Sequence, residues 1–369
     1  MRDNERERQG TYIPPEARGL SEEEDQIRQT VSRRLDTSKS ERAKWQHFTP
    51  EFLDTKLHEI NIDQLRKQIN HGADNYVGGK VEQFKGRVEV KTELPIAISH
   101  IGDTHLGSIY TNTDEVFRKL KRIKETPNAF VIFMSNLIDN AIPAQYPDSM
   151  LANAIPPDQQ VELIRNTIED MDMSGKVLGA VTSPCHEGWT WKKAGQDINN
   201  LIFGFKGRKF PVLENGGELE IKVGDQDYSG ALYHQTGPFE SRFNETHALK
   251  QLNRLQKGMR MDWMAGAHRH FAAAETVYED QGEHRKPVAY IRTGTEKGTG
   301  DIHDKWAVDR YGNGAEPTGQ TVHLFPKQRR VMATLDFDDA MMAHESFYVS
   351  EMAKQDIEKK PKRRTRGKS

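Results

Sequence analysis

Residues 94–105 read LPIAISHIGDTH, an apolar run that passes directly into a polar loop. The apolar part has the length of a buried strand and a proline near its start, so we expect a strand over 95–101. Gly102 allows the backbone to turn sharply, so that Asp103 and His105 can point towards the same place. Carboxylates and neutral imidazoles are ligands of divalent metals, although a single Asp-x-His is more often part of a surface loop.

The chain that follows this stretch alternates between helix and strand patterns. Residues 112–125 place their apolar side chains on one helical face, and residues 129–134 form a second short apolar run. A helix over 158–171 and a strand over 176–182 come next. This alternation is typical of a parallel sheet with helices on its faces, so the sequence predicts the α/β class.

The second half of the chain is richer in strand patterns. One helix is expected there, over 243–256. The expected strands cover 219–223, 228–234, 262–265, 271–278, 288–292 and 330–337. Such a series can build a second sheet that faces the first.

Polar clusters follow the predicted strands one after another. After Asp103 and His105, they are Asn136 with Asp139, Cys185-His186-Glu187, His234, and His268-x-His270. In α/β proteins, ligands bind where the carboxyl ends of the strands meet, so we expect these clusters to converge. A lone histidine is seldom a ligand, but a series of clusters that each end a strand is difficult to attribute to chance. The sequence therefore predicts a metal site.

The composition limits the functions that the chain can have. It holds 53 Lys and Arg against 55 Asp and Glu, so its net charge favours neither nucleic acid nor a membrane. Charged residues make up 29% of the 369 residues, and the hydrophobic class makes up 35%. We interpret this as a globular centre with charge-rich ends, and a centre of roughly 250 residues can bury one sizeable core.

The compartment follows from cysteine usage and from the apolar runs. Cys185 is the only cysteine and cannot form an internal disulfide, which fits a reducing compartment. No apolar run reaches the roughly 18 residues of a membrane span. The first ten residues, MRDNERERQG, lack the apolar segment of a secretory signal. We therefore expect a cytoplasmic protein that does not contact membranes.

The two ends differ from the centre. Residues 1–45 are charged and poor in aromatics, so we expect a disordered or partly helical extension, with a small helix-turn-helix module as the alternative. Residues 50–70 keep roughly helical spacing of apolar side chains, so we expect a small helical segment within 46–90. Residues 341–369 are expected to form a C-terminal helix and a basic tail. The tail is either simply solvated or contacts phosphate backbones through Lys360, Arg363 and Arg364.

The order of the polar clusters resembles that of the calcineurin-like metallophosphoesterases. This family includes Ser/Thr phosphatases, purple acid phosphatases, cyclic-nucleotide phosphodiesterases and nucleases of the SbcD type. Its pattern is Asp-x-His, Gly-Asp-x-x-Asp, Gly-Asn-His-Asp/Glu, a lone His, and Gly-His-x-His. The resemblance spans about residues 96–270 and implies a four-layer α/β/β/α sandwich of two mixed sheets flanked by helices, which we expect over 91–340.

The resemblance also implies two divalent metal ions, with Mn²⁺, Zn²⁺ or Fe as the candidates. The first ion would be held by Asp103, His105 and His270, and the second by His234 and His268. The family's two remaining ligand positions fall on Asn136 and Cys185.

The catalytic roles come from the same resemblance. His186 would approach the scissile phosphate without binding metal and would assist the leaving oxygen. Glu187 would hold either His186 or the neighbouring loop, and Asp139 would support the metal ligands.

Two ligand positions depart from the family pattern. Asn136 stands where the family has the aspartate that bridges both metals, and an amide offers one oxygen and no charge. Cys185 stands where the family has an asparagine, and a thiolate binds zinc or iron better than magnesium. Three interpretations stay open: an altered pair of metals that supports catalysis, a single ion at the first site with weak activity, and a domain without catalysis that acts as a scaffold.

The function expected from the resemblance is divalent-metal-dependent hydrolysis of a phosphoester by a hydroxide that two metals activate. A phosphodiester in nucleic acid, such as DNA, is our first choice of substrate. The alternatives are a phosphomonoesterase or cyclic-nucleotide phosphodiesterase, and a catalytically impaired binding or structural protein. The sequence leaves the oligomeric state open.

Other polar features carry weaker expectations. The Gly-rich stretch 294–300 lacks the end of a P-loop and is expected to be a surface turn. Trp189 and Trp191 are expected to pack, with stacking on a base as the alternative. Arg242 and His247 follow the His234 motif and are candidates to face the cleft.

Overall fold

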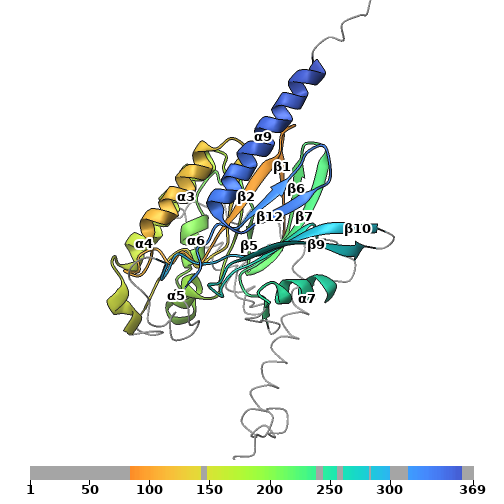
Figure 1. The fold of residues 1–369 in the computed structure, drawn as a ribbon. Coiled ribbons are helices and arrows are strands. Elements are labelled where there is room, and N and C mark those ends of the chain that lie inside the picture. The colour runs from red at the N-terminus through yellow and green to blue at the C-terminus, as the bar shows by residue number, and fades with distance from the viewer. Residues whose placement is uncertain are drawn as a thin grey trace, which may run out of the picture. The chain divides into compact units, whose positions relative to one another are not determined.

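The computed structural model describes the chain from residue 84 to residue 359, apart from several short segments (Figure 1). All of the described residues belong to one unit of the chain, Glu82–Ser369. The described ranges are 84–142, 148–237, 244–255, 261–281, 284–299 and 315–359. The expectations for residues 1–83, for Arg242 and for the basic tail from Lys360 onwards lie outside them.

One six-stranded sheet contains β2, the strand within residues 94–105. Its strand order is β12-β11-β2-β3-β4-β5. β2, β3, β4 and β5 run parallel to one another, whereas β11 is antiparallel to both of its neighbours, β2 and β12. The bounds are β2 Ile96–Ile101, β3 Ala129–Phe133, β4 Val177–Val181, β5 Val212–Leu213, β11 Thr321–Leu324 and β12 Val331–Thr334.

A second six-stranded sheet has the order β1-β6-β7-β8-β10-β9. It is mixed: β7, β8 and β10 run parallel, while β6 and β9 are antiparallel to β7 and β10. The bounds are β1 Lys85–Val90, β6 Gly216–Val223, β7 Gln226–Tyr233, β8 Trp263–Gly266, β9 Ala273–Gln281 and β10 His284–Arg292. β1 lies within residues 46–90, so the structure has a strand where a helical segment was expected.

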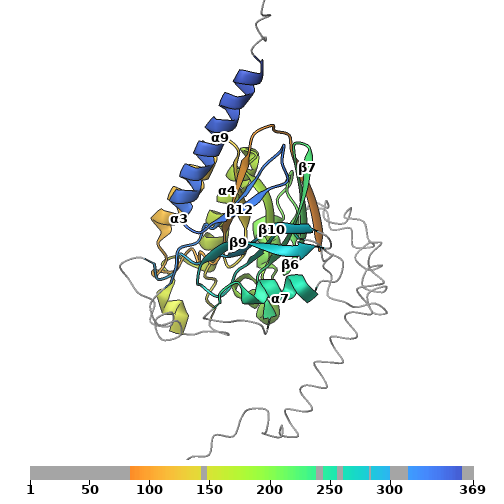
Figure 2. The same ribbon diagram turned by 45° about the vertical axis from the view of Figure 1, so that its right-hand side comes forward.

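Helices lie outside both sheets and complete four layers (Figures 1 and 2). The sheet that contains β2 packs against α3, α4, α6 and α9, and the other sheet packs against α7. The bounds are α3 Thr113–Glu125, η3 Asp148–Ala152, α4 Pro157–Met173, α5 His186–Ala194, α6 Ile198–Phe203, α7 His247–Leu255 and α9 Phe337–Lys359. The predicted α/β/β/α sandwich is confirmed.

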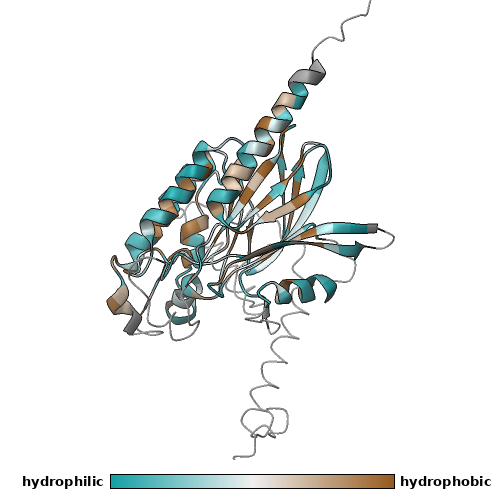
Figure 3. Ribbon diagram, viewed as in Figure 1, coloured by the Kyte–Doolittle hydropathy of each residue, from teal (hydrophilic) through white to brown (hydrophobic). Residues whose placement is uncertain are grey.

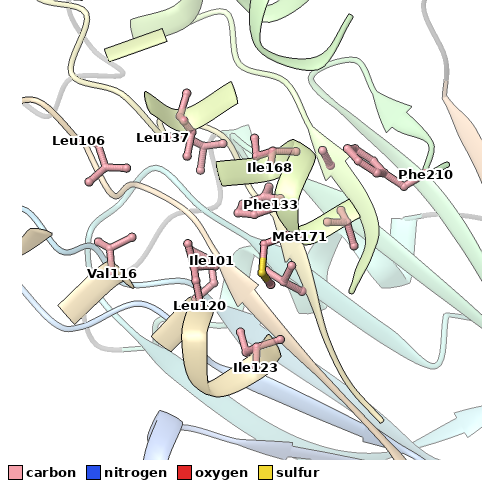
Figure 4. Close-up of a cluster of buried hydrophobic side chains, with 14 of the residues drawn as sticks. Ile101, Leu106, Val116, Leu120, Ile123, Phe133, Leu137, Ile168, Met171 and Phe210 are labelled. Atoms are coloured by element: carbon pink, nitrogen blue, oxygen red, sulfur yellow. The ribbon is translucent and has the colours of Figure 1, made fainter. Parts of the chain in front are cut away.

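The apolar patterns explain why these elements stack. All six residues of β2 are buried, because one face meets the second sheet and the other meets the helices. Ile101, Leu120 and Phe133 belong to the core between sheet and helices (Figure 4). Full burial of each such side chain contributes about 1.5–3 kcal/mol. Along α3 the apolar residues gather on one buried face, which also carries Lys119, and the rest of the helix is largely hydrophilic (Figure 3).

A local signal explains where α3 begins. The side chain of Asn112 accepts a hydrogen bond from the backbone N–H of Glu115 and caps α3, which begins one residue after the predicted start. The strand predicted over 330–337 ends earlier, at Thr334, and α9 begins at Phe337. Among the described helices, none combines the length and apolar character needed to cross a membrane.

Candidate metal centre

The loops at the carboxyl ends of the strands bring the predicted ligands together. Five of these residues have left-handed backbone conformations, with φ between 48° and 77°: Asp103, His105, Asn136, His268 and His270. Such conformations cost about 1–3 kcal/mol each outside glycine and concentrate at functional sites. These strained conformations occur in the loops after β2, β3 and β8, where the side chains converge.

The first ligand set consists of Asp103, His105 and His270, whose ligand atoms lie within 4.8 Å of one another. The Nε2 atoms of the two histidines are 3.1 Å apart, and Asp103 Oδ1 is 3.7 Å from His270 Nε2. Asp139 Oδ1 accepts a hydrogen bond from His105 Nδ1 at 3.2 Å, which leaves the lone pair on His105 Nε2. A carboxylate that orients a histidine in this way is typical of metal sites.

The second ligand set consists of Cys185, His234 and His268, also within 4.8 Å of one another. Cys185 Sγ lies 3.8 Å from His268 Nδ1. His234 Nδ1 donates to the backbone oxygen of Met134 at 3.1 Å, so its lone pair is on Nε2. That atom is buried and has no hydrogen-bond partner among the described residues.

Asn136 lies against the first ligand set. Its Nδ2 donates to Asp103 Oδ1 at 2.9 Å, and its buried Oδ1 accepts no hydrogen bond from the part of the chain that the structure describes. The second oxygen of Asp103 accepts from the backbone N–H of His268 at 2.6 Å. Asp103 therefore connects the loops of the two ligand sets, while Asn136 contributes an oxygen and no charge.

The side chains present fit divalent metal ions. Buried polar atoms without a partner, as at Asn136 Oδ1 and His234 Nε2, are costly unless a ligand satisfies them. A carboxylate with two imidazoles suits manganese, zinc or iron, and a thiolate with two imidazoles suits zinc or iron. The donor sets are thus those of a divalent metal centre, and they leave the choice between these metals open.

Burial sets the protonation of the ligands before any metal binds. It lowers the pKa of His234 to about 3 and that of His270 well below its usual value, so both rings are neutral and competent to bind metal. Burial raises the pKa of Asp103 and that of the Cys185 thiol. A divalent cation reverses the effect on these two groups, because it stabilises the carboxylate and the thiolate directly.

His186 lies beside the first ligand set at the start of α5. Its Nδ1 contacts the backbone oxygen of Asp139, so Nε2 is the atom available to another group. The ring is 4.3 Å from that of His105, and Trp189 stacks on it with ring centroids 3.9 Å apart. Burial lowers its pKa well below the usual value, and the ring is therefore neutral. Trp189 packs as expected, and the ring on which it packs is that of His186.

Glu187 holds the neighbouring loop. Its Oε1 accepts from the backbone N–H of Leu137 at 2.6 Å, and its Oε2 accepts from Ser135 Oγ at 3.3 Å. The carboxyl group is buried, and burial raises its pKa to about 7. Of the two supporting roles considered for Glu187, these contacts match the one that fixes the loop containing Asn136.

Two side chains near the centre were missed by the sequence analysis. Gln235 Nε2 lies 3.0 Å from Cys185 Sγ and 3.1 Å from His268 Nε2, and its position next to His234 was the available signal. Lys297 Nζ lies 2.8 Å from Asp139 Oδ1. The Gly-rich stretch that contains Lys297 was interpreted as a surface turn, so Lys297 was given no role at the centre.

That interpretation of residues 294–300 is wrong over the described part, 294–299. Thr295 and Glu296 are fully buried. Gly294 passes so close to the backbone of Glu316 that a β-carbon there would lie 2.0 Å from its oxygen. The glycine therefore serves a close packing of two chain segments. The structure places His247 at the start of α7 and leaves Trp191 half exposed.

Comparison with known proteins gives matches of fold. No family model matches the sequence, and no curated protein matches it. A calcineurin-like phosphoesterase from Bacillus subtilis matches with 10% identity and a TM-score of 0.37, over 72% of this chain and 99% of that one.

Two further solved structures are similar. A predicted phosphoesterase from Streptococcus pneumoniae matches with 12% identity and a TM-score of 0.27, over 66% of this chain and 98% of that one. A metallophosphoesterase from Sphaerobacter thermophilus matches with 13% identity and a TM-score of 0.31, over 69% of this chain and 96% of that one.

Proposed function

We propose that this chain is a divalent-metal-dependent phosphoesterase. The observation that carries the proposal is the pair of ligand sets, Asp103/His105/His270 and Cys185/His234/His268, at the carboxyl ends of strands from both sheets. His186 lies beside the first set, and its Nδ1 is already engaged. Two metal-binding sets next to His186 suit an enzyme that hydrolyses a phosphate ester better than a protein that only binds a ligand.

Divalent ions held by the two sets would lower the pKa of a water molecule and offset the charge on the phosphate oxygens. The protein's part is to orient the ligands. Asp139 fixes the tautomer of His105, the backbone oxygen of Met134 fixes that of His234, and Glu187 fixes the loop that carries Asn136. This preorganisation places the ligands before the substrate arrives.

His186 supplies the group that meets the leaving oxygen. The contact between Nδ1 and Asp139 directs Nε2 away from the loop and leaves it for the substrate. The imidazole is neutral in the protein alone, and a bound phosphate would raise its pKa, because a nearby negative charge favours the protonated ring. Protonated His186 can then donate a hydrogen bond to the leaving oxygen.

A phosphodiester in nucleic acid remains our first choice of substrate. Its support is the basic tail with Lys360, Arg363 and Arg364, because basic side chains bind phosphate backbones without a fold of their own. Phosphomonoesters and cyclic nucleotides are the alternative substrates. A protein that binds without catalysis is the alternative of a different class.

One assay series tests these alternatives. The metal-loaded protein is incubated with bis(p-nitrophenyl) phosphate, with p-nitrophenyl phosphate and with single- and double-stranded DNA, in Mn²⁺ and in Zn²⁺. We expect the diester and DNA to be hydrolysed, and His186→Ala to lose about 100-fold or more in rate at unchanged metal content. Full activity of His186→Ala would remove the role assigned to His186. No turnover of any substrate by the wild type would favour the binding protein.

A further inference from the structure

Lys297 lies within the candidate centre without being a metal ligand. Its Nζ is 2.8 Å from Asp139 Oδ1, and its side chain is only 12% exposed. The same oxygen accepts the hydrogen bond from His105 Nδ1. One carboxylate oxygen therefore connects the lysine ammonium to the first ligand set.

The ammonium of Lys297 contacts a third group of side chains that are of metal-ligand type. His105, Asp139 and His186 offer atoms within 4.8 Å of one another and by residue type could hold an ion. The ammonium of Lys297 already contacts the shared oxygen of Asp139, so a metal ion held by this group would have to displace it. The third group thus holds an ammonium in place of a metal ion.

The loop that carries Lys297 is fixed on both sides. Glu296 is buried and forms an ion pair with Lys119 at 2.6 Å, and its Oε1 also accepts from the backbone N–H of Thr318 at 3.2 Å. The backbone oxygen of Glu296 accepts from Asn112 at 2.9 Å. These contacts tie the loop to the start of α3, so Lys297 is held in place before substrate binds.

The field of Lys297 reaches the catalytic side of the centre. Asp139 Oδ1, which Lys297 Nζ contacts at 2.8 Å, also lies 3.9 Å from His186 Nδ1. Asn136 provides no negative charge at the position where the family has a bridging carboxylate. The ion pair of Lys297 with Asp139 and the uncharged amide of Asn136 add no net negative charge to the ligand sets, so little opposes the approach of an anion.

We propose that Lys297 binds a phosphate oxygen of the substrate as a third, built-in cation of the centre. This rests on the proposed function, because it assumes that a phosphate group occupies the site. Asp139 orients the ammonium, and a lysine has three N–H donors with which it can serve both Asp139 and a phosphate. Lys297 is then a binding residue, and its contribution appears in phosphate affinity rather than in metal affinity.

The experiment measures binding of inorganic phosphate to the full-length, metal-loaded protein by isothermal titration calorimetry. Lys297→Gln removes the charge and keeps a donor for Asp139, and Lys297→Met removes both. Lys121→Met is the matched control, because Lys121 lies on α3 with its side chain 75% exposed. Metal content is measured for every variant by inductively coupled plasma mass spectrometry.

We expect both Lys297 variants to bind phosphate at least about tenfold more weakly, and the control to bind as the wild type does. Metal content should stay that of the wild type, at least in Lys297→Gln. Unchanged phosphate affinity in Lys297→Gln would overturn the proposal. A loss of metal in Lys297→Gln would also overturn it, because Lys297 would then act only through Asp139 on His105.

The outcome is separable from that of the proposed function. Phosphate binding that depends on Lys297, in a protein without turnover, would support the anion site and contradict the hydrolase. Turnover with phosphate affinity that does not depend on Lys297 would support the hydrolase and contradict the anion site. A wild type that binds no phosphate at millimolar concentration would contradict the proposal for Lys297.

Discussion

At the scale of single residues, the centre is defined by two exchanges of ligand type. Asn136 brings an oxygen without charge, and Cys185 brings a sulfur that becomes charged when a metal binds. The sequence was enough to name both positions, because the motifs around them keep their order. The contacts of Asp139 with Lys297 and of Cys185 with Gln235 were not predicted, because neither Lys297 nor Gln235 belongs to the ordered motifs.

Restoring the carboxylate at position 136 tests the first exchange. In Asn136→Asp the new charge would lie next to Asp103 Oδ1, which Asn136 Nδ2 contacts at 2.9 Å. Without metal the two carboxylates repel each other, and with metal the added charge strengthens binding. We expect lower stability of the metal-free protein and at least about tenfold tighter metal binding, measured by competition with a chelator. Weaker metal binding would mean that the centre depends on the amide.

Glu187 makes stability depend on pH. Its pKa is raised by burial to about 7 in the folded protein, from a usual value near 4.3. The folded state therefore holds a proton that the unfolded state has released between these pH values, and stability falls as pH rises from about 4.5 to about 7. The loss amounts to about 4 kcal/mol at most.

Chemical denaturation of the metal-free protein at pH 5 and pH 7.5 measures this loss. Glu187→Gln cannot ionise but can still accept from Leu137, so its stability should change less between the two pH values. An equal change in variant and wild type would assign the pH dependence to other groups.

At the scale of elements, periodicity located most helices and strands. β2, β3 and β4 are short apolar runs, and α3 and α4 have an apolar face, so each was predicted within a few residues. α5 was missed, because its glycine and two tryptophans give no apolar face with helical spacing. β1 was also missed, because its residues alternate weakly and its partner β6 lies over a hundred residues away.

The loop that carries Lys297 depends on a buried ion pair. Lys119 and Glu296 are both almost fully buried and 2.6 Å apart. Lys119→Met would leave Glu296 buried without its charged partner, which costs about 3–5 kcal/mol. We expect this loss of stability in chemical denaturation. The double variant Lys119→Met with Glu296→Gln should recover part of it, and no recovery would mean that the pair has no role of its own.

At the scale of the whole molecule, the centre lies where two sheets place their strand ends together. The alternation of the first half predicted one sheet, and the strand-rich second half predicted the other. The sequence could not give the registers, or that β7 and β8 run parallel side by side, because pairing depends on contacts across the sheet. These pairings bring His234 and His268 into one ligand set.

The basic tail tests whether nucleic acid is the substrate. Truncation after Lys359 removes Lys360, Arg363 and Arg364 and leaves α9 intact. We expect weaker DNA binding and a smaller dependence of the binding constant on salt, because fewer phosphates are contacted. Hydrolysis of bis(p-nitrophenyl) phosphate should be unchanged. DNA binding that survives the truncation would separate the tail from substrate recognition.

The central claim is that the two ligand sets bind two divalent ions and that Cys185 is a ligand of one. Inductively coupled plasma mass spectrometry on protein purified without chelator, alongside Cys185→Ala, tests it most directly. The account predicts about two ions per chain, falling towards one in the variant. Less than about half an ion per chain, the same in the variant and not restored by added manganese or zinc, would contradict it.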